Sequence, residues 1–534
     1  QQLETGWFYS NDPPRQFAQL LLQLPLQAAQ AVGVSDLALL GGIYGASLYG
    51  LPLLLLLLCY HYCENKAYFL FPLSSYLLAS LPAYSFIISE AHLLAGLFWL
   101  CAVLINRSQA LTFGQWLLLL ALAILGSRSY ETAAFLLPAL VLMIVLRGRL
   151  QLSIRAAPWW LLAVILIVGA IMSAQGALEP RDTVNQGRYL QAVGQILTGS
   201  VYLQAVAIAL LVLGVLHKYG SRLTIRSVAM ACALLTLCLT LIFAQVPGLL
   251  NLDLAYPSRV LLLPVPFALS GLYLLATRLP DTRRLQLVHG LASICLFCAS
   301  YQFAAQLHAS YQWDGYRRVF QRTLQAGPPR IIEFRDTVLG RDYEGRVALR
   351  AQHWRWTLPL LNIVFAIDGQ VQRYLYDARA AYQPYNLHKL PRLEDRYGVR
   401  YLFSNRVEPG ELLTFNHAKL HFDQWYRPGA DFRWARGGDA ELRFLTADHQ
   451  QFSGSATVKL GVRRQQELEI WLNDMLLFTG KLERARESIE LKFDPRLLKT
   501  GSENTLSFWF SDPRVASERD RRMLAGKFRS LQLH

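Results

Sequence analysis

Residues 37–58 read LALLGGIYGASLYGLPLLLLLL, an apolar run without a single charged side chain. A helix needs roughly 20 apolar residues to cross the hydrocarbon core of a bilayer. This stretch therefore predicts a membrane-spanning helix. It also sets the fold class, because comparable runs follow it as far as residue 305.

The apolar runs predict ten spans in this sequence: 37–58, 67–88, 92–105, 113–126, 133–147, 158–174, 201–217, 228–247, 259–277 and 286–305. The chain begins at Gln1 rather than at a methionine, so we expect a processed or missing segment before it. One further span there would bring the total to eleven.

Composition agrees with a membrane protein, since 53% of the 534 residues are hydrophobic and only 17% are charged. A soluble protein carries about 25% charged residues. The fold class predicted is a polytopic α-helical membrane domain followed by an external α/β linker and a β-sandwich. The predicted domains are an external segment (1–36), a transmembrane domain (37–305), a small α/β domain (306–410) and a sandwich (411–534).

Basic residues on alternate loops orient the predicted spans. They gather after the fifth span and again two and four loops later, and the loops that carry such residues face the cytoplasm. The other loops, residues 1–36 and everything after 305 are then external. The clusters are Arg147, Arg149 and Arg155; Lys218, Arg222 and Arg226; and Arg278, Arg283 and Arg284.

The net charge of +15 is spread along the chain without a dense basic run, which favours anionic lipid or phosphate-bearing substrates over nucleic acid. The seven cysteines all lie in or beside apolar runs. The spacings of Cys59 with Cys63 and of Cys295 with Cys298 suit a metal site. Packing as small apolar side chains is the favoured interpretation.

Acids and arginines gather in the predicted external loops, several of them at the mouths of spans. Ionisable groups at that depth are costly unless they are paired or functional. Together they suit an outward-facing site with a general base and an anion-binding surface. The candidates are Asp12 and Glu90 as catalytic residues, with Arg259, Arg128, His92, Glu131, Asp253, Arg188 and Tyr256 around the substrate.

Each candidate also has a structural interpretation. Asp12, next to Pro13 and Pro14, is a good helix N-cap. Glu90 could pair with His92 or with a neighbouring arginine, and His92 could be a satisfied interfacial histidine. Glu131 could form an ion pair with Arg128.

Residues 16–32 alternate apolar and glutamine positions and end at Gly33. This pattern predicts a helix lying in the outer interface, bent at Pro25.

The polar C-terminal part shows period-two alternation after about residue 411, for example in 457–462, 468–472, 475–478, 489–493 and 505–510. Short alternating runs joined by turns, such as Asn473-Asp474, predict an antiparallel sandwich. Trp425, Tyr426 and Trp434 could stack on sugars, although packing in the core is the favoured interpretation.

The layout resembles the GT-C class of membrane glycosyltransferases, with a C-terminal sandwich as in the cell-wall arabinosyltransferases. That class carries an acid in the first external loop, ahead of interfacial helices, and a second acid between its third and fourth spans. Once a first span is added, Asp12 and Glu90 occupy these positions. Asn11-Asp12 stands where an acidic pair would strengthen a metal site, so a divalent cation stays an open alternative.

The resemblance implies an inverting glycosyltransferase of the bacterial inner membrane, with its C-terminal domain in the periplasm. Asp12 would take a proton from an acceptor hydroxyl, and a polyprenyl phosphate would leave into a field of arginines. The implied partners are a polyprenyl-phosphate-sugar donor, a glycan, lipid or protein acceptor and an envelope protein. The alternative is a non-catalytic membrane assembly protein whose sandwich binds a glycan or a partner.

Overall fold

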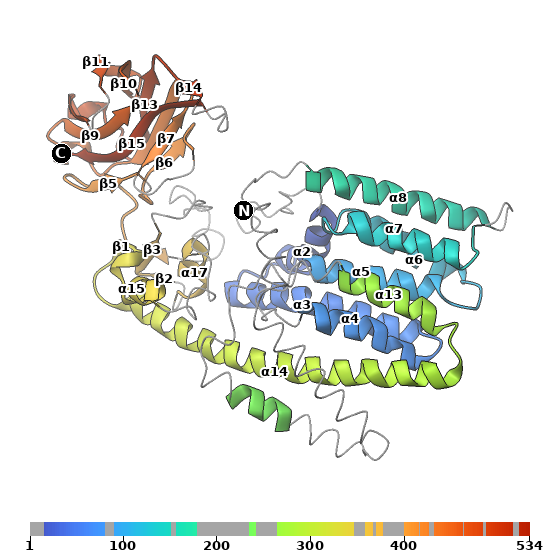
Figure 1. Cartoon of the computed structure of the whole chain (residues 1–534). Coiled ribbons are helices and arrows are strands. Elements are labelled where there is room, and N and C mark those ends of the chain that lie inside the picture. The colour runs from blue at the N-terminus through green and yellow to red at the C-terminus, as the bar shows by residue number, and fades with distance from the viewer. Residues whose placement is uncertain are drawn as a thin grey trace. The chain divides into compact units, whose positions relative to one another are not determined.

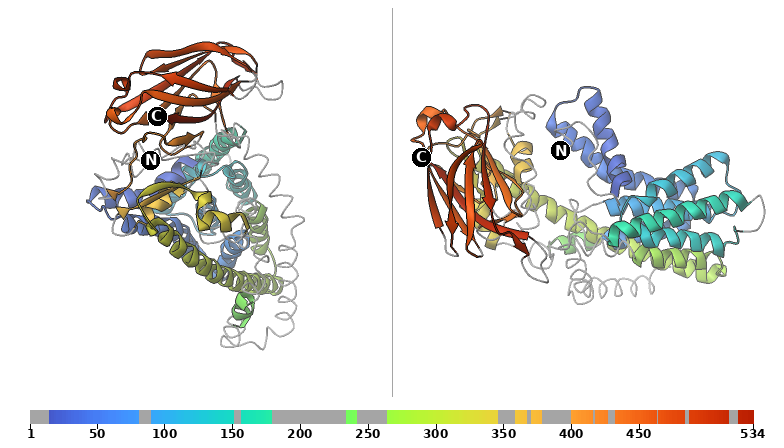
Figure 2. Two further views of the ribbon diagram at one scale, coloured as in Figure 1. Left: turned by 90° about the vertical axis from the view of Figure 1, so that its left-hand side faces the viewer. Right: turned by 90° about the horizontal axis from the view of Figure 1, so that it is seen from above.

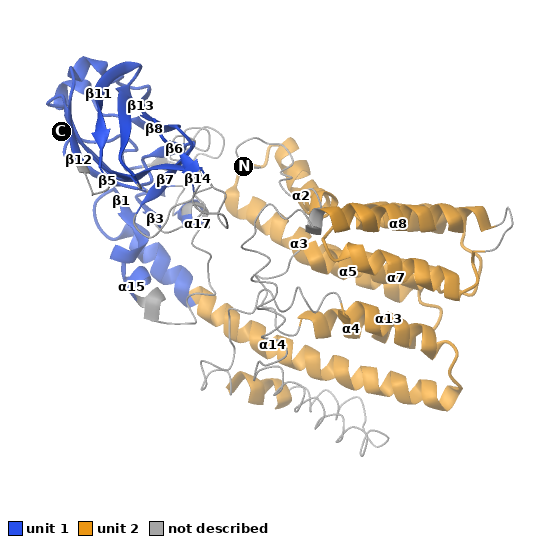
Figure 3. Ribbon diagram, turned by 45° about the horizontal axis from the view of Figure 1, so that its top comes forward, with its two compact units in different colours: residues 1, 3, 315–534 blue, residues 2, 4–314 orange. Residues whose placement is uncertain are grey.

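The computed structural model describes residues 15–80, 90–150, 156–178, 234–241, 264–345, 358–366, 370–377, 400–415, 417–426, 432–462, 464–483, 487–515 and 523–534. Contacts divide the chain into two compact units, one made mostly of residues 4–314 and the other mostly of residues 315–534 (Figure 3). The first, here called the helical unit, is α-helical, and the second, the β-rich unit, carries the sheets. This division into helical and β-rich halves confirms the coarse fold class.

The helical unit contains helices that lie side by side in both sets of views (Figures 1 and 2). Their bounds are α2 (Gln16–Ala31), α3 (Leu37–Tyr62), α4 (Leu70–Ser80), α5 (Glu90–Ile105), α6 (Phe113–Ser127), α7 (Ala133–Leu146), α8 (Ala157–Leu178), α13 (Pro264–Ala276) and α14 (Asp281–Gln325). The last residues of α14, from Gly315 on, belong to the β-rich unit.

Polar residues fix where the apolar helices begin. The Asp36 carboxylate accepts a hydrogen bond from the amide of Leu39 at 2.7 Å and caps α3. Thr112 and Gln115 form a reciprocal capping box at the start of α6. Both caps satisfy backbone N–H groups that the first helical turn leaves unpaired.

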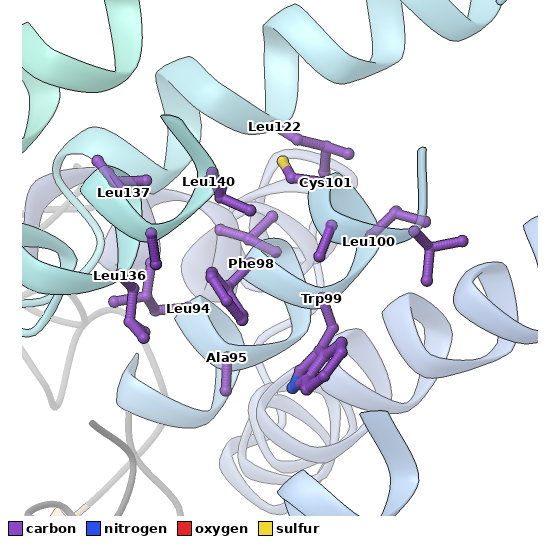
Figure 4. Close-up of a cluster of buried hydrophobic side chains, with 14 of the residues drawn as sticks. Leu94, Ala95, Phe98, Trp99, Leu100, Cys101, Leu122, Leu136, Leu137 and Leu140 are labelled. Atoms are coloured by element: carbon purple, nitrogen blue, oxygen red, sulfur yellow. The ribbon is translucent and has the colours of Figure 1, made fainter. Parts of the chain in front are cut away.

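Helix α5 forms the centre of the helical unit, because every side chain from Ala91 to Ile105 is buried. Figure 4 shows Phe98 and Trp99 among leucines from α5, α6 and α7. Gly96 lets α3 approach closely, since an added Cβ would lie 2.9 Å from Leu55 Cδ1. A helix that is apolar on all sides is typical of a protein core or of a membrane span.

Three described helices are long and apolar enough to cross a membrane, namely α3, the first 19 residues of α8 and α14. Helices α5, α6, α7 and α13 have 13 to 16 residues and are shorter than a full span. At 1.5 Å per residue they extend about 20–24 Å, against a hydrocarbon core of roughly 30 Å. The described residues thus contain fewer full-length spans than the ten predicted. The run 201–217 lies outside the described residues.

Helix α14 runs without interruption from Asp281 to Gln325, through the boundary predicted at 305/306. The first residues of the range predicted as the small α/β domain are therefore part of α14. The reason is that the sequence places no proline inside the helix, and the first strong stop is Gly327 at φ +105°, followed by Pro328.

The β-rich unit begins with a small α/β part. Strand β1 (Arg330–Glu333) pairs in parallel with β3 (Arg373–Tyr376), and β2 (Gln370–Val371) pairs with β4 (Arg400–Tyr401). Helices α15 (Val338–Gly345) and α17 (Leu358–Val364) accompany them. The fully buried Asn362 donates to the carbonyl of Leu375 at 2.8 Å and accepts from its amide at 3.0 Å, so α17 is tied to β3.

Two antiparallel sheets form the rest of this unit. One has the order β11-β10-β13-β8-β6 and the other β12-β9-β15-β14, with β5 and β7 also on β15. Their bounds are β5 (Leu412–Thr414), β6 (His421–Asp423), β7 (Arg433–Arg436), β8 (Asp439–Leu445), β9 (Ser455–Val462), β10 (Gln466–Leu472), β11 (Met475–Leu482), β12 (Glu487–Lys492), β13 (Glu503–Phe510), β14 (Arg514–Val515) and β15 (Met523–Leu533).

The predicted turn between β10 and β11 is confirmed. Asn473 and Asp474 both have positive φ, 48° and 70°, as a two-residue hairpin loop requires. Alternate side chains of β8, β10 and β13 enter one apolar core, which includes Phe508 and Phe528.

Trp425 belongs to that core. It is 9% exposed and packs edge-on against Phe422, Phe508 and Phe528, so it cannot serve as an exposed sugar platform. Its indole N–H donates to the carbonyl of Glu441 at 2.9 Å, which satisfies the buried donor.

Packing of cysteines as small apolar side chains is confirmed for Cys59, Cys63, Cys101, Cys295 and Cys298, which are buried, whereas Cys238 is exposed.

Candidate functional site

The loop between α6 and α7 holds the first residues of α2. The amide of Phe17 donates to the carbonyl of Arg128 at 3.0 Å, and Arg128 Nη1 donates to Gln16 Oε1 at 2.7 Å. Arg15 places both Nε and Nη2 on Glu131 Oε1, at 2.9 and 2.6 Å. Backbone and side-chain contacts thus join the start of α2 to this loop.

Hydroxyl groups and a glycine shape the loop. Ser129 is fully buried and donates to the carbonyl of Leu125 at 2.5 Å, while Ser173 of α8 donates to the carbonyl of Ser127 at 2.7 Å. Gly169 permits the close approach of α8, because an added Cβ would lie 2.6 Å from Ser127 Cβ. These bonds satisfy the carbonyls at the end of α6, which have no partner within the helix.

Apolar packing secures α2 behind these polar contacts. Ala18 and Leu22, one turn apart, are 0% and 2% exposed and join the same core as α5. The polar start and the apolar face of α2 therefore dock together, as expected of an amphipathic helix.

Arg15 is the electrostatic centre of this end of the unit. Its guanidinium lies 4.7 Å from the centre of the Tyr130 ring. Burial alone would lower the pKa of Arg15, but interactions with Tyr130, Glu131 and Glu90 outweigh it and raise that pKa above the ordinary value. Both acids thus act on one arginine, and Glu131 contacts it directly at 2.6 Å.

Glu90 is half-buried and opens α5, where a negative charge suits the positive end of the helix dipole. His92 lies two residues further into α5 and is fully buried. Its ring packs edge-on against Tyr76 of α4, with centroids 5.6 Å apart. His92 therefore lies between helices rather than beside the loop.

The structure brings together Arg128, Glu131 and, through Arg15, Glu90. It places His92 deeper, against α4. The remaining predicted site residues, Asp12, Arg188, Asp253, Tyr256 and Arg259, lie outside the described residues.

The ion pair considered between Glu131 and Arg128 is replaced by one between Glu131 and Arg15. Arg128 is the C-cap residue of α6, and its carbonyl is bonded to Phe17, so its side chain extends toward Gln16. Its bonded partner there is a neutral amide. The charge of Arg128 is consequently not neutralised by Glu131 and can act on an anion.

Arg15, Gln16 and Tyr130 are the contributors that the sequence-based site omitted. One signal pointed to Arg15, since an arginine at the start of an amphipathic interfacial helix needs a partner or a functional role. No comparable signal marked Gln16 or Tyr130. Within the described residues, no group of three or more His, Cys, Asp or Glu side chains is arranged to hold a metal ion.

Comparison with known proteins adds little. No family model and no curated protein matches the sequence. Among solved structures, the chain is similar to a glycoside hydrolase family 43 arabinoxylan arabinofuranohydrolase from Bacillus subtilis, in complex with cellotetraose. The identity is 11% over 25% of this chain and 29% of that chain, with a TM-score of 0.17, too low to support an argument about fold or function.

Proposed function

We propose that the chain is a polytopic membrane glycosyltransferase of the GT-C type, which transfers a sugar from a polyprenyl-phosphate donor with inversion. The proposal includes the ten spans, the external site and the periplasmic β-rich unit expected from the sequence. The observation that carries it is the bonding at the start of α2, where Glu131 pairs with Arg15 and Arg128, within the described part of the chain, is bonded to the neutral side chain of Gln16.

Arg128 supplies the anion-binding part of this mechanism. A leaving polyprenyl phosphate gains negative charge in the transition state, and a fixed arginine stabilises it without reorganisation. Gln16 fixes the guanidinium from one side through a single Nη1 bond. In the proposal, Arg188 and Arg259 add charge, and Asp253 and Tyr256 line the substrate.

The three acidic residues Glu131, Asp12 and Glu90 have different roles in the proposal. Glu131 is committed to Arg15 and positions α2, so it is a positioning residue rather than a base. Asp12 stands three residues before Arg15 in the sequence and is proposed as the general base. Glu90 is the second acid, and a divalent cation between the two remains an open part of the proposal.

The test is sugar transfer in membrane vesicles from labelled polyprenyl-phosphate sugars. Asp12→Asn should abolish transfer at unchanged expression, because the acceptor then lacks a base. Arg128→Gln should lower kcat by about 10²-fold, the loss typical of one transition-state donor. Asp281→Asn and Arg283→Gln, both at exposed positions, serve as charge-matched controls and should leave transfer unchanged.

Failure of these variants to differ from the controls would remove both residues from the mechanism. If no donor supports transfer by folded wild-type protein, the enzymatic proposal fails and the assembly-protein alternative gains support.

One feature of the β-rich unit favours the alternative in which the sandwich binds a glycan. On the outer face of the five-stranded sheet, β10 and β13 are paired so that Trp509 opposes Glu469 and Trp471 opposes Ser507. The two tryptophans are thus diagonal neighbours, and Trp471 Nε1 donates to Glu469 Oε2 at 3.2 Å. The exposed Trp509 ring and the half-buried Trp471 ring beside a carboxylate offer both stacking and hydrogen-bond acceptors to a sugar.

Glycan-array binding by the full chain separates this role from catalysis. Trp509→Ala should reduce glycan binding without affecting transfer. Met523→Ala removes a side chain of equal exposure, 40%, from the other sheet and should change neither.

A further inference from the structure

Four arginines meet at the end of the helical unit opposite the α6–α7 loop. This basic cluster consists of Arg107 after α5, Arg147 and Arg149 after α7, and Arg278 after α13. Arg149 Nη2 donates to the carbonyl of Arg107 at 2.6 Å, and Arg278 Nη2 donates to the carbonyl of Leu146 at 3.0 Å. Three separate loops therefore converge on one place.

Neutral groups hold most of these guanidinium groups in position. Arg147 donates through Nε to Asn106 Oδ1 at 2.6 Å and through Nη2 to Thr277 Oγ1 at 3.2 Å. The charges of Arg149 and Arg278 both act on Arg147. Oriented arginines that repel one another are a prepared site for an anion.

The nearby acid compensates only part of this charge. Glu64 lies 3.8 Å from Arg107 Nε and already accepts two hydrogen bonds from Ser108, at 3.0 and 2.8 Å. Among the described residues, the buried Nε of Arg149 has no hydrogen-bond acceptor. A buried donor without a partner is destabilising, and an acceptor oxygen would remove that cost.

The surroundings of the basic cluster suit a lipid. Arg149 lies 5.3 Å from the ring centre of Trp159, which packs against Trp116 with centroids 4.6 Å apart. Tryptophans and arginines at helix ends are typical of the bilayer interface. Directly along the helices, Leu142 of α7 and Leu275 of α13 are each 50% exposed and offer an apolar path for acyl chains.

We propose that the basic cluster binds the phosphate headgroup of an anionic phospholipid of the surrounding bilayer. The phosphate oxygens accept hydrogen bonds from Arg149, Arg147 and Arg278, and the acyl chains lie along α7 and α13. The inference rests on the membrane embedding proposed above and is independent of the glycosyltransferase chemistry.

The experiment measures lipid binding by the purified full chain in neutral detergent, using native mass spectrometry and thermal shift. Phosphatidylglycerol should bind at least tenfold more tightly than phosphatidylcholine of the same chain length. Arg278→Gln and Arg149→Gln should each weaken phosphatidylglycerol binding about fivefold, which corresponds to about 1 kcal/mol per basic residue at a membrane surface. The exposed Arg283 provides the control, and Arg283→Gln should bind as the wild type does.

Arg149→Lys guards against a folding artefact, because it keeps the charge and should retain most of the binding. Equal affinity for the two lipids, or equal losses in Arg283→Gln, would overturn the proposal. Competition by inorganic phosphate at the same concentration would show a site for free anions and overturn the lipid assignment. Release of the wild-type chain from membranes by alkaline carbonate would instead overturn the membrane embedding itself.

Discussion

The pair between Arg15 and Glu131 gives the sharpest prediction about stability. Two donors of Arg15 meet one carboxylate oxygen, and the side chains are only 22% and 27% exposed. Exposed ion pairs contribute about 0–1 kcal/mol, and loss of one partner from a fully buried pair costs about 3–5 kcal/mol. We therefore expect Arg15→Gln and Glu131→Gln each to reduce the free energy of unfolding by about 2 kcal/mol.

The assay is thermal unfolding of the purified full chain in detergent at a fixed scan rate. Each single variant should lower Tm by about 4 °C, at roughly 2 °C per kcal/mol for a unit of this size. The double variant should lose about as much as either single one, because the same interaction is removed. The pairing would be refuted if the decreases in Tm were additive in the double variant, or if the single variants had the same Tm as the wild type.

Three further predictions concern the β-rich unit. Gly526→Ala should destabilise it by about 1–3 kcal/mol in thermal unfolding, because the added Cβ would overlap the ring of Phe510. Burial and the charge of Lys419 lower the pKa of His417 from 6.5 to about 3. The neutral His417 ring therefore contributes fully to the stability of the folded state above pH 6.5, and this contribution falls by about 1.4 kcal/mol per pH unit as the pH drops toward 3. Between pH 7 and 4.5 the Tm of His417→Gln should consequently fall less than the Tm of the wild type. Asn362→Ala should cost about 2–4 kcal/mol and remove the hydrogen-exchange protection of the β3 amide that it accepts from.

Gly461 provides a matched control for the Gly526→Ala variant. Gly461 lies on the strand beside Gly526, and an added Cβ there would make only an ordinary contact at 4.0 Å with Lys527. Gly461→Ala should therefore leave Tm nearly unchanged. An equal loss in both glycine variants would show that flexibility, rather than overlap with the ring, causes the effect.

The sequence predicted what depends on local pattern. Apolar runs marked where α3, α5, α6 and α7 lie, because hydrophobicity along the chain directly reflects exclusion from water. The positive-φ turn at Asn473 was also recognisable, since few residues tolerate that conformation. The continuity of α14 was missed because its apolar and polar portions suggested two domains, although the backbone contains no break.

Ion pairs between residues far apart in the sequence could not be predicted from local pattern. Arg128 and Glu131 are neighbours in the sequence with opposite charges, and this proximity suggested a pair. The actual partner of Glu131 is Arg15, 116 residues away. Nothing local distinguishes these alternatives, because the choice depends on how α2 packs against the helices.

The distance in sequence between Arg15 and Glu131 also determines an order of assembly. The groups that receive the start of α2 are Arg128 and Glu131, so this helix cannot complete its docking until they have been synthesised. At about 5–20 residues per second, a gap of 116 residues leaves roughly 6–23 seconds of waiting. During that interval the buried side of α2, with Ala18 and Leu22, has to be shielded by lipid or by a chaperone.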